Sequence, residues 1–167
     1  MEPYLYFGSL GAHERQYQIP NFTGLALEPK HGREIKHDLT QPLPYPDNSI
    51  AKVQAQDVLE HLAFDKVPFV LDEIYRVLKS GGRLAVSDMA WAIEPAASLR
   101  KDMEALVGCI GGALVLDDYV SRLRQAGFAC VEIEKHAEAA RKMVEVSGTV
   151  PPPGIEHLLS VNITATK

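Results

Sequence analysis

The stretches His37–Leu62, HDLTQPLPYPDNSIAKVQAQDVLEHL, and Val70–Met89, VLDEIYRVLKSGGRLAVSDM, decide the fold. Within the first, Ile50–Gln56 alternates apolar and polar side chains, which is typical of a strand with one buried face. Within the second, Arg83–Ser87 is short, apolar and bounded by glycine and aspartate, as in a buried strand. These stretches therefore predict two strands with a longer segment between them.

That intervening segment has the pattern of an amphipathic helix. Asp65 is a suitable N-cap, Pro68 is tolerated in the first turn, and Gly81–Gly82 is expected to end the helix. A strand, a helix and a strand of these lengths form a right-handed crossover, so the two strands are expected to be parallel. The apolar residues recur at the i, i+3, i+4, i+7 spacing of one helical face: Val67, Val70, Leu71, Ile74, Val77 and Leu78.

Further strands and helices alternate on both sides of this unit. The final two strands have no clear crossover between them, so the last is expected to be antiparallel, although the segment 138–146 leaves a helix open there. The sequence thus predicts one domain over residues 1–167, with an α/β fold and a Rossmann-like, doubly wound, mostly parallel sheet of about seven strands. The additional strands are expected at 4–8, 22–27, 34–37, 131–133 and 159–163, and the additional helices at 94–107 and 116–126.

Composition places the chain among ordinary globular proteins. Its 167 residues are 46% hydrophobic and 23% charged, and the net charge is −5. This acidic balance, without a basic cluster, argues against nucleic acid or an anionic membrane as partner. No apolar run approaches a membrane span, and the N-terminal residues do not resemble a signal peptide. Two cysteines without a metal-like spacing predict no metal site, and a reducing, cytoplasmic setting is expected.

The residues that follow each strand are the candidates for ligand binding, because open parallel sheets bind ligands beyond the carboxyl ends of their strands. Gly8 and Gly11 follow the first strand, where glycines allow close backbone approach to a ligand or simply make a turn. Glu28 follows the second strand, twenty residues after Gly8, where a carboxylate can accept hydrogen bonds from ribose hydroxyls or merely end a strand. Asp38 follows the third strand, where it accepts from an adenine amine or caps a turn.

The run from Asp38 to Asp88 resembles the middle of the class I S-adenosylmethionine-dependent methyltransferases, of the methyltransferase type 11 kind. Their aspartate, their LP-aromatic-PDNS turn, a strand ending near LEH, a helix with E..RVLKPGG and a strand closing on Ser-Asp all occur here in order. Ser80 stands where the family usually has proline. The later run GGALVLDDYVSRLRQAGFACVEIE resembles the distal part of the same superfamily. The resemblance covers about fifty residues in its specific part.

The resemblance implies S-adenosylmethionine as cofactor and a role for each strand end. The methionine end of the cofactor would be lined by Gly8, Ser9 and Gly11, and its ribose would be held by Glu28. Asp38 and Leu39 would flank the adenine. After the fourth strand, the residues expected to face the sulfonium and the acceptor are Gln56, Asp57 and His61; the last could equally satisfy a backbone group.

The N-terminal part departs from the family pattern. The glycine loop is poorer than GxGxG, and the short connections 12–21 and 29–33 leave little room for helices. Helices on one face of the sheet are therefore expected to be reduced. Such a face could expose an apolar patch, which raises the hypothesis of a homodimer.

The expected function is in-line transfer of a methyl group from S-adenosylmethionine to a small-molecule acceptor. Such a reaction asks the protein mainly to align its reactants. A base is needed only where the acceptor must lose a proton, and Asp57, His61 and Asp88, at strand ends, are the candidates for that role.

Three alternatives stay open. The reduced glycine loop favours a catalytically inactive domain that serves in binding or assembly. The stretch CIGGAL around Cys109 resembles arsenite methyltransferases, but only Cys130 is left as a second thiol. A nicotinamide-dependent oxidoreductase is disfavoured because the chain lacks GxGxxG.

Overall fold

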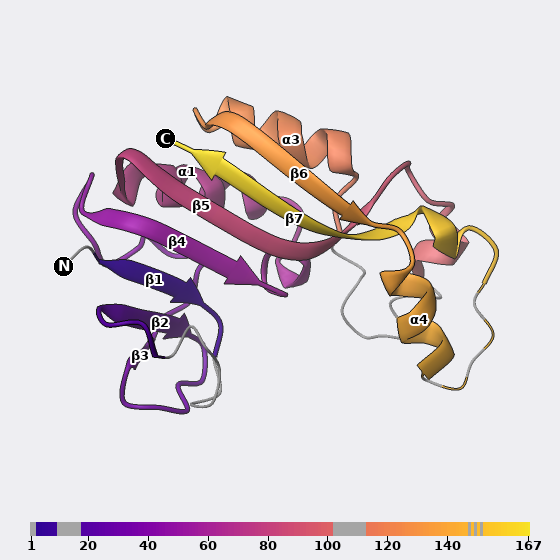
Figure 1. Ribbon diagram of the computed structural model, residues 1–167, viewed down its shortest axis with the longest axis horizontal. Coiled ribbons are helices and arrows are strands. Elements are labelled where there is room, and N and C mark those ends of the chain that lie inside the picture. Colours follow the sequence, from indigo (N-terminus) through magenta and orange to yellow (C-terminus); the bar gives the residue numbers. More distant parts are fainter. Residues whose placement is uncertain (1–2, 10–17, 102–112, 147, 149, 151) are drawn as a thin grey trace.

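A seven-stranded sheet in the order β3-β2-β1-β4-β5-β7-β6 forms the centre of the molecule (Figure 1). This computed structural model describes residues 3–9, 18–101, 113–146, 148, 150 and 152–167. The five strands from β3 to β5 are parallel, and β7 runs antiparallel to both β5 and β6. The predicted, mostly parallel sheet with an antiparallel last strand is therefore confirmed. The strands are β1 (Tyr4–Phe7), β2 (Phe22–Ala26), β3 (Glu34–Lys36), β4 (Ile50–Gln56), β5 (Leu78–Trp91), β6 (Ala129–His136) and β7 (Leu158–Thr166).

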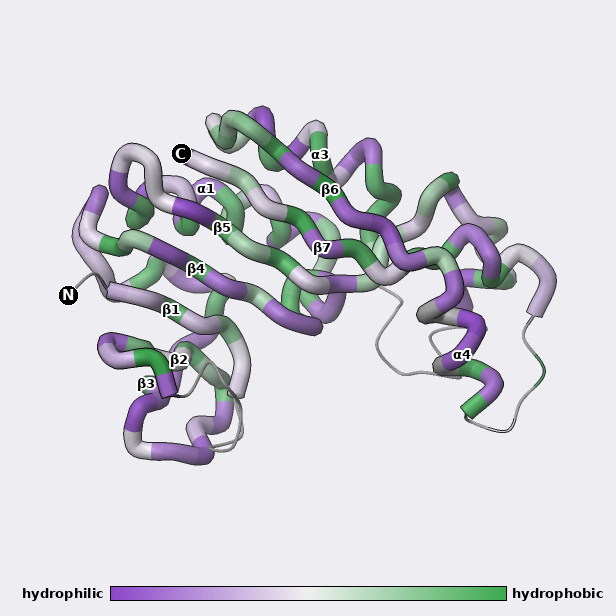
Figure 2. The backbone as a smooth tube through the Cα atoms, viewed as in Figure 1, coloured by the Kyte–Doolittle hydropathy of each residue, from purple (hydrophilic) through white to green (hydrophobic). Residues whose placement is uncertain are grey.

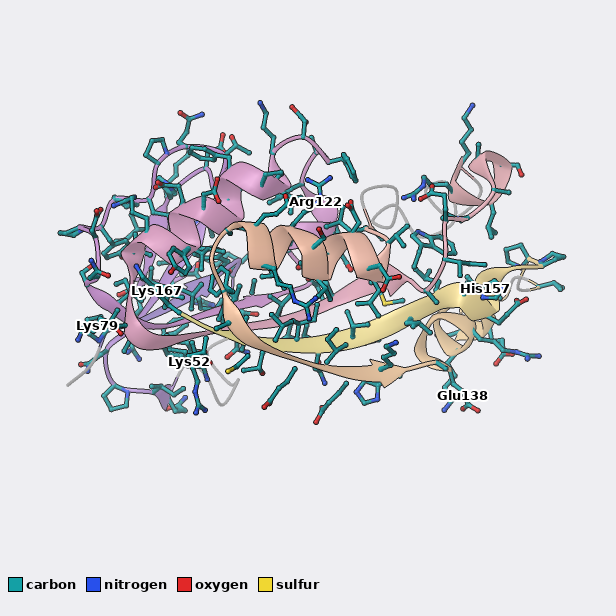
Figure 3. The ribbon with its side chains drawn as sticks, turned by 90° about the horizontal axis from the view of Figure 1, so that it is seen from above. Lys52, Lys79, Arg122, Glu138, His157 and Lys167 are labelled. Atoms are coloured by element: carbon teal, nitrogen blue, oxygen red, sulfur yellow. The ribbon has the colours of Figure 1, made fainter. Side chains whose placement is uncertain are left out.

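Helices α1 (Val67–Val77) and α3 (Leu116–Gln125) lie together on one face of the sheet (Figure 3). The connections also contain α4 (Ala139–Val146), which contacts β7, and two short 3-10 turns, η2 (Leu59–His61) and η3 (Ile155–His157). Of the helix expected at 94–107, residues 97–101 are helical and 102–107 lie outside the described residues. Across the described ranges, no helix is long and apolar enough to cross a membrane.

The ends of α1 differ from the prediction at both termini. Lys66, not Asp65, occupies the N-cap position, and Pro68 lies in the first turn as expected. The helix ends at Val77, because Leu78 is already extended and pairs with Ile50 as the first residue of β5. The two glycines therefore lie inside β5, at its irregularity, where a Cβ on Gly82 would stand 2.8 Å from the carbonyl oxygen of Lys79.

The helix-covered face of the sheet carries the main hydrophobic core. Inward residues of α1 such as Leu71 and Ile74 are fully buried there, and Tyr119 and Leu123 of α3 join them. The strand residues that complete this face alternate along each strand and include Leu5, Phe7, Leu25, Val53, Ala55, Leu84, Val86, Val161, Ile163 and Ala165. The alternation of apolar residues along each strand therefore determines which face of the sheet the helices cover.

The opposite face, here called the open face, carries no helix over β1 to β4 in the described part of the chain (Figure 3). At its far end, Val144 of α4 packs with Met89 and Trp91 of β5 and Leu158 of β7. Connection 27–33 is irregular, and of connection 8–21 only its two ends are described. Tyr4, Tyr6 and Phe22 form a small buried cluster here. The remaining positions of β4 to β7 are mostly polar, and Figure 2 shows hydrophilic and hydrophobic residues alternating along these strands. The expected apolar patch is thus wrong for the described residues, while connection 27–33 lacks a helix as expected.

Candidate functional site

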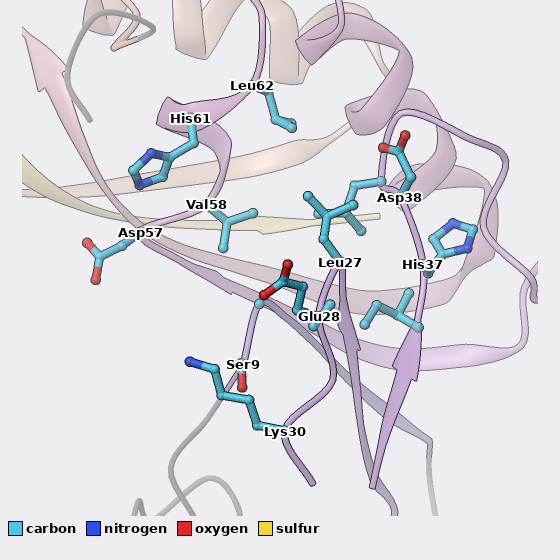
Figure 4. A pocket seen from close by; sticks show the side chains of 14 residues that line it. Ser9, Leu27, Glu28, Lys30, His37, Asp38, Asp57, Val58, His61 and Leu62 are labelled. Atoms are coloured by element: carbon cyan, nitrogen blue, oxygen red, sulfur yellow. The ribbon is translucent and has the colours of Figure 1, made fainter. Parts of the chain in front are cut away.

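A cavity of about 480 Å³ opens where the parallel strands β1 to β4 end (Figure 4). In the sheet order, β1 lies between β2 and β4, so strand order reverses at this point. Open α/β sheets bind their ligands at such a reversal, beyond the carboxyl ends of the strands. The cavity is lined by Gly8, Ser9, Leu25, Ala26, Leu27, Glu28, Lys30, His37, Asp38, Leu39, Asp57, Val58, His61 and Leu62.

The loop after β1 brings its backbone close to the neighbouring strand end. Gly8 has a φ of +96°, a conformation that favours glycine, and its N–H donates to the carbonyl of Leu25 at 2.9 Å. A Cβ on Gly8 would approach Val58 Cγ2 to 3.2 Å. The Ser9 hydroxyl donates to both carboxylate oxygens of Glu34, at 3.0 and 3.2 Å. Gly8 and Ser9 thus form one wall of the cavity, and Gly11 lies outside the described residues.

The loop after β2 supplies two charged side chains to the cavity lining. Glu28 is exposed, and its carboxylate lies between the Ser9 and Leu27 sides of the pocket in Figure 4. Lys30 lines the same cavity, and its backbone N–H donates to Glu34 at 2.6 Å. A carboxylate and an ammonium group therefore project from one short loop.

The loop after β3 forms the opposite wall. Asp38 accepts the backbone N–H of Thr40 at 2.9 Å and its hydroxyl at 2.8 Å, and these hydrogen bonds lower the pKa of the Asp38 carboxyl. Leu39 is buried and joins the core. In the described part of the chain, Nε2 of His37 is buried without a hydrogen-bond partner. A buried nitrogen of this kind commonly pairs with a ligand or with water.

The loop after β4 places two polar side chains at the other end of the cavity. Asp57 has a φ of +50°, which is uncommon for a residue with a side chain, and its N–H donates to the carbonyl of Ser87 at 2.8 Å. His61 ends the 3-10 turn η2, and its Nε2 lies 3.8 Å from Glu60 Oε1. In Figure 4, Asp57 and His61 lie on one side of the pocket and Asp38 and His37 on the other, so the cavity has two differently equipped ends.

Two buried carboxyls, here called the acid pair, lie beneath this loop. Burial raises the pKa of Glu60 to about 8, with nearby Asp88 and Asp57 adding to the rise. Burial likewise raises the pKa of Asp88 to about 7, against hydrogen bonds that act in the opposite direction.

Both carboxyls of the acid pair hold the loop to its surroundings. Glu60 accepts the backbone N–H of Met89. Asp88 accepts the N–H of Val58 at 3.2 Å and the hydroxyl of Tyr119 at 3.0 Å. The acid pair therefore joins η2, β5 and α3 behind the end of the cavity that carries Asp57 and His61.

The structure brings most of the expected site residues to a single cavity. Gly8, Ser9, Glu28, Asp38, Leu39, Asp57 and His61 all line it. Gln56, at the end of β4, is not among the lining residues. Sequence reasoning missed Lys30 and His37, which also line the cavity. Each lies within two residues of an expected acid, Glu28 or Asp38, so their position just after a strand could have identified them. Glu34 was also missed, because its long-range contacts leave no local pattern.

The thiols do not test the arsenite alternative. Cys130 is exposed on β6, and Cys109 lies outside the described residues.

The cavity lies at the strand-order reversal of an open sheet, and the fold is that of the class I S-adenosylmethionine-dependent methyltransferases. Residues 18–86 match a family model described as "Methyltransferase domain". Together with the structural neighbours below, this match confirms the resemblance to that superfamily.

Two curated relatives and one solved structure illustrate the similarity. The chain is 38% identical over 97 residues to an arsenite methyltransferase of Halobacterium salinarum, covering 58% of this chain and 24% of that protein. It is 40% identical over 89 residues to a 27-O-demethylrifamycin SV methyltransferase of Amycolatopsis mediterranei, covering 51% and 31%. The chain thus spans less than a third of these relatives' length. Geranyl diphosphate C-methyltransferase of Streptomyces coelicolor, solved with S-adenosyl-L-homocysteine, superposes with a TM-score of 0.73 at 14% identity, over 99% of this chain and 72% of that one.

Proposed function

We propose that this chain is a methyltransferase domain that binds S-adenosylmethionine in the cavity at the strand-order reversal and methylates a small-molecule acceptor. One observation carries the proposal: a cavity of about 480 Å³ gathers Glu28, Asp38, His37 and Lys30 from the ends of neighbouring parallel strands. That volume falls within the range of about 300–1,000 Å³ common for small-ligand sites. The match of residues 18–86 to a methyltransferase family supports it.

The polar groups of the cavity fit the parts of this cofactor. Glu28 accepts hydrogen bonds from the ribose hydroxyls, as acids after a second strand do in nucleotide-binding sheets. Asp38 and the unpartnered nitrogen of His37 address the adenine edge, with the backbone and side chain of Leu39 beside it. Gly8 and Ser9 line the methionine end, where Lys30 offers a cation to its carboxylate.

The end of the cavity lined by Asp57 and His61 faces the acceptor. When bound, S-adenosylmethionine supplies a methyl group already activated on its sulfonium. The chain's own contribution is to align the acceptor, exclude water and, for an acceptor that must lose a proton, to take that proton on Asp57 or His61. Small-molecule acceptors are consistent with related enzymes, one of which is named for geranyl diphosphate.

Titration calorimetry with S-adenosylmethionine and S-adenosylhomocysteine tests the binding step. We expect saturable binding by the intact chain and at least a tenfold loss of affinity in Glu28→Ala, since a good pair of hydrogen bonds to a charged group contributes about 1.5–3 kcal/mol. Glu132→Ala, which removes an exposed carboxylate from β6 on the open face, is the matched control and leaves affinity unchanged. No binding by the intact chain contradicts the proposal. Binding that is indifferent to Glu28 contradicts only its role.

A domain that binds without transferring methyl groups is the second candidate. It is favoured by the connections around the cavity, which contain no helix in residues 27–33 and 18–21 apart from a single 3-10 residue. Incubation with methyl-labelled cofactor and a panel of hydroxyl, amine and thiol acceptors separates the two. Label transferred to any acceptor, and lost in Asp57→Asn or His61→Ala, supports the enzyme; binding with no transfer to the whole panel supports the second candidate. A cytoplasmic location and a homodimer stay predictions of the sequence.

A further inference from the structure

We infer that Glu34 is a positioning residue: its buried carboxylate ties the loop after β1 to the loop after β2 and thereby sets the shape of the cofactor cavity. The inference rests on the proposed function only for the identity of the ligand. The tie itself lies entirely within the described residues.

Glu34 connects the two loops through three recorded hydrogen bonds. Its carboxylate accepts the Ser9 hydroxyl at 3.0 and 3.2 Å and the Lys30 backbone N–H at 2.6 Å. Ser9 and Lys30 line the cavity from different loops, and Glu34 itself is not among the lining residues. It therefore acts behind the cavity wall, through the groups that form it.

The sheet is built to let this side chain pass. Glu34 is the first residue of β3 and pairs with Gly24 of β2, which in turn pairs with Tyr6 of β1. A Cβ on Gly24 would stand 2.8 Å from Glu34 Cγ, so the side chain lies across the space that the glycine leaves empty. An alanine there would push the carboxylate away from Ser9. Gly24 and Glu34 are thus matched to each other.

Glu34 is buried behind the cavity wall and is only 9% exposed. The connection 27–33, which its carboxylate holds through the Lys30 N–H, has no helix of its own. Burying a carboxylate costs free energy unless hydrogen bonds compensate, and those bonds are spent on the two cavity loops. One buried side chain thus joins both cavity loops.

A second carboxylate offers a matched control. Glu73 of α1 accepts the Leu43 N–H at 2.7 Å and pairs with Arg76, so it also ties a loop to the fold, but Glu73, Leu43 and Arg76 are all absent from the cavity lining. Its loss should disturb folding without altering the cavity. Comparison of Glu34 and Glu73 therefore separates a positioning role from a general structural one.

The first measurement uses the protein without ligand. Amide hydrogen exchange, followed by NMR, should show faster exchange of the Lys30 amide and of the 7–9 and 28–31 segments in Glu34→Ala, while Glu73→Ala leaves these amides as they are. Glu34→Gln, whose amide oxygen still accepts, should restore most of the protection. Unchanged exchange in Glu34→Ala overturns the inference whether or not a cofactor binds.

The second measurement is the affinity for S-adenosylhomocysteine by calorimetry. We expect Glu34→Ala to bind about 10- to 100-fold more weakly, as is usual when the residue that orients a binding group is removed. Glu34→Gln stays within about threefold of the parent chain and Glu73→Ala within about twofold. Equal affinities for Glu34→Ala and Glu73→Ala would overturn the inference. Failure of the parent chain to bind contradicts the proposed function instead, and the exchange measurement then decides the role of Glu34.

Should Glu34→Ala fail to fold, Ser9→Ala removes one arm of the tie and leaves the carboxylate in place. Amide exchange at residues 7–9 should then become faster, while the Lys30 amide, held by the other arm, keeps its protection. Unchanged exchange at residues 7–9 overturns the inference by this route.

Discussion

The two faces of the sheet differ in almost every respect, although each strand contributes alternate residues to both. Leu84 and Ile163 lie on the covered face beneath the helices and are at most 1% exposed. Their neighbours Arg83 and Thr164 lie on the open face and are partly or fully accessible. Parallel sheets usually have both faces covered by helices, so strands buried on both sides read as continuous apolar runs. In this chain β4 and β7 alternate instead.

The difference shows that the one-sided arrangement is encoded in the strands as well as in the short connections. A sheet that had merely lost helices would expose apolar side chains along its centre. The open face has Gln54, Ser87, Asn162 and Thr164 around a shallow hollow instead. Tyr4, Tyr6 and Phe22 form a buried apolar group at one end of this face, with Lys52 over the Tyr4 ring, and Trp91 and Leu158 form part of another beneath α4. Over the middle of the sheet, where no described helix covers this face, the strands are therefore adapted to its exposure.

Leu71→Ala should have the largest effect, because it opens a cavity in the covered face. Leu71 of α1 is fully buried within the main core. We expect the free energy of unfolding to fall by about 2–5 kcal/mol, measured by urea denaturation. Asp72→Ala, an exposed position of the same helix, is the control and should change it by less than about 0.5 kcal/mol. A loss below about 1 kcal/mol for Leu71→Ala would mean that the covered face is not the main core.

Glu60→Gln tests the acid pair, Glu60 and Asp88, whose carboxyls are buried on the otherwise apolar covered side. Because burial raises the pKa of Glu60 to about 8 and that of Asp88 to about 7, the folded chain holds protons that the unfolded chain has released. Stability from these groups is therefore present at acid pH and is lost as pH rises toward 8. Between about pH 5 and 7, each group contributes a fall of at most about 1.4 kcal/mol per pH unit. Glu60→Gln should make the slope of unfolding free energy against pH shallower and stabilise the chain at pH 8.

Denaturation at several pH values measures that slope. Glu132→Gln, an exposed carboxyl of β6, is the control and should leave the slope unchanged. An unaltered slope in Glu60→Gln would show that Glu60 is ionised in the folded chain at neutral pH.

Tyr4→Phe tests the buried group of the open face. The Tyr4 hydroxyl donates to Gln54 Oε1 at 2.5 Å, and burial raises the pKa of Tyr4 to about 12. Removing the hydroxyl should lower the free energy of unfolding by about 1 kcal/mol. Tyr4→Phe in a Gln54→Ala background provides the comparison, because the acceptor of the bond is then gone. An equal loss in that background would show that the Tyr4–Gln54 bond adds nothing specific.

The sequence predicted what depends on local pattern. The alternation of Ile50–Gln56 and the spacing of the α1 residues placed strands and helix on the correct face, and strand ends pointed to the residues that meet at the cavity. It misplaced the end of α1, because Leu78 pairs across the sheet with Ile50 and local pattern does not record that partner. Glu34 escaped notice for the same reason: its contacts with Ser9 exist only once three strands are side by side.

Thr164→Val should have the smallest effect on stability, and with Ile163→Thr it compares the open and the covered face directly. Thr164 and Ile163 are neighbours on β7, on the open and the covered face respectively. Because Thr164 is only partly buried and valine has its shape and strand preference, we expect a change within about 0.5 kcal/mol in the free energy of unfolding. Ile163→Thr places a hydroxyl among apolar side chains and should cost about 2 kcal/mol or more. A large gain in stability from Thr164→Val would instead indicate that something covers the open face in solution, which sedimentation of the two variants at matched concentration would reveal as self-association.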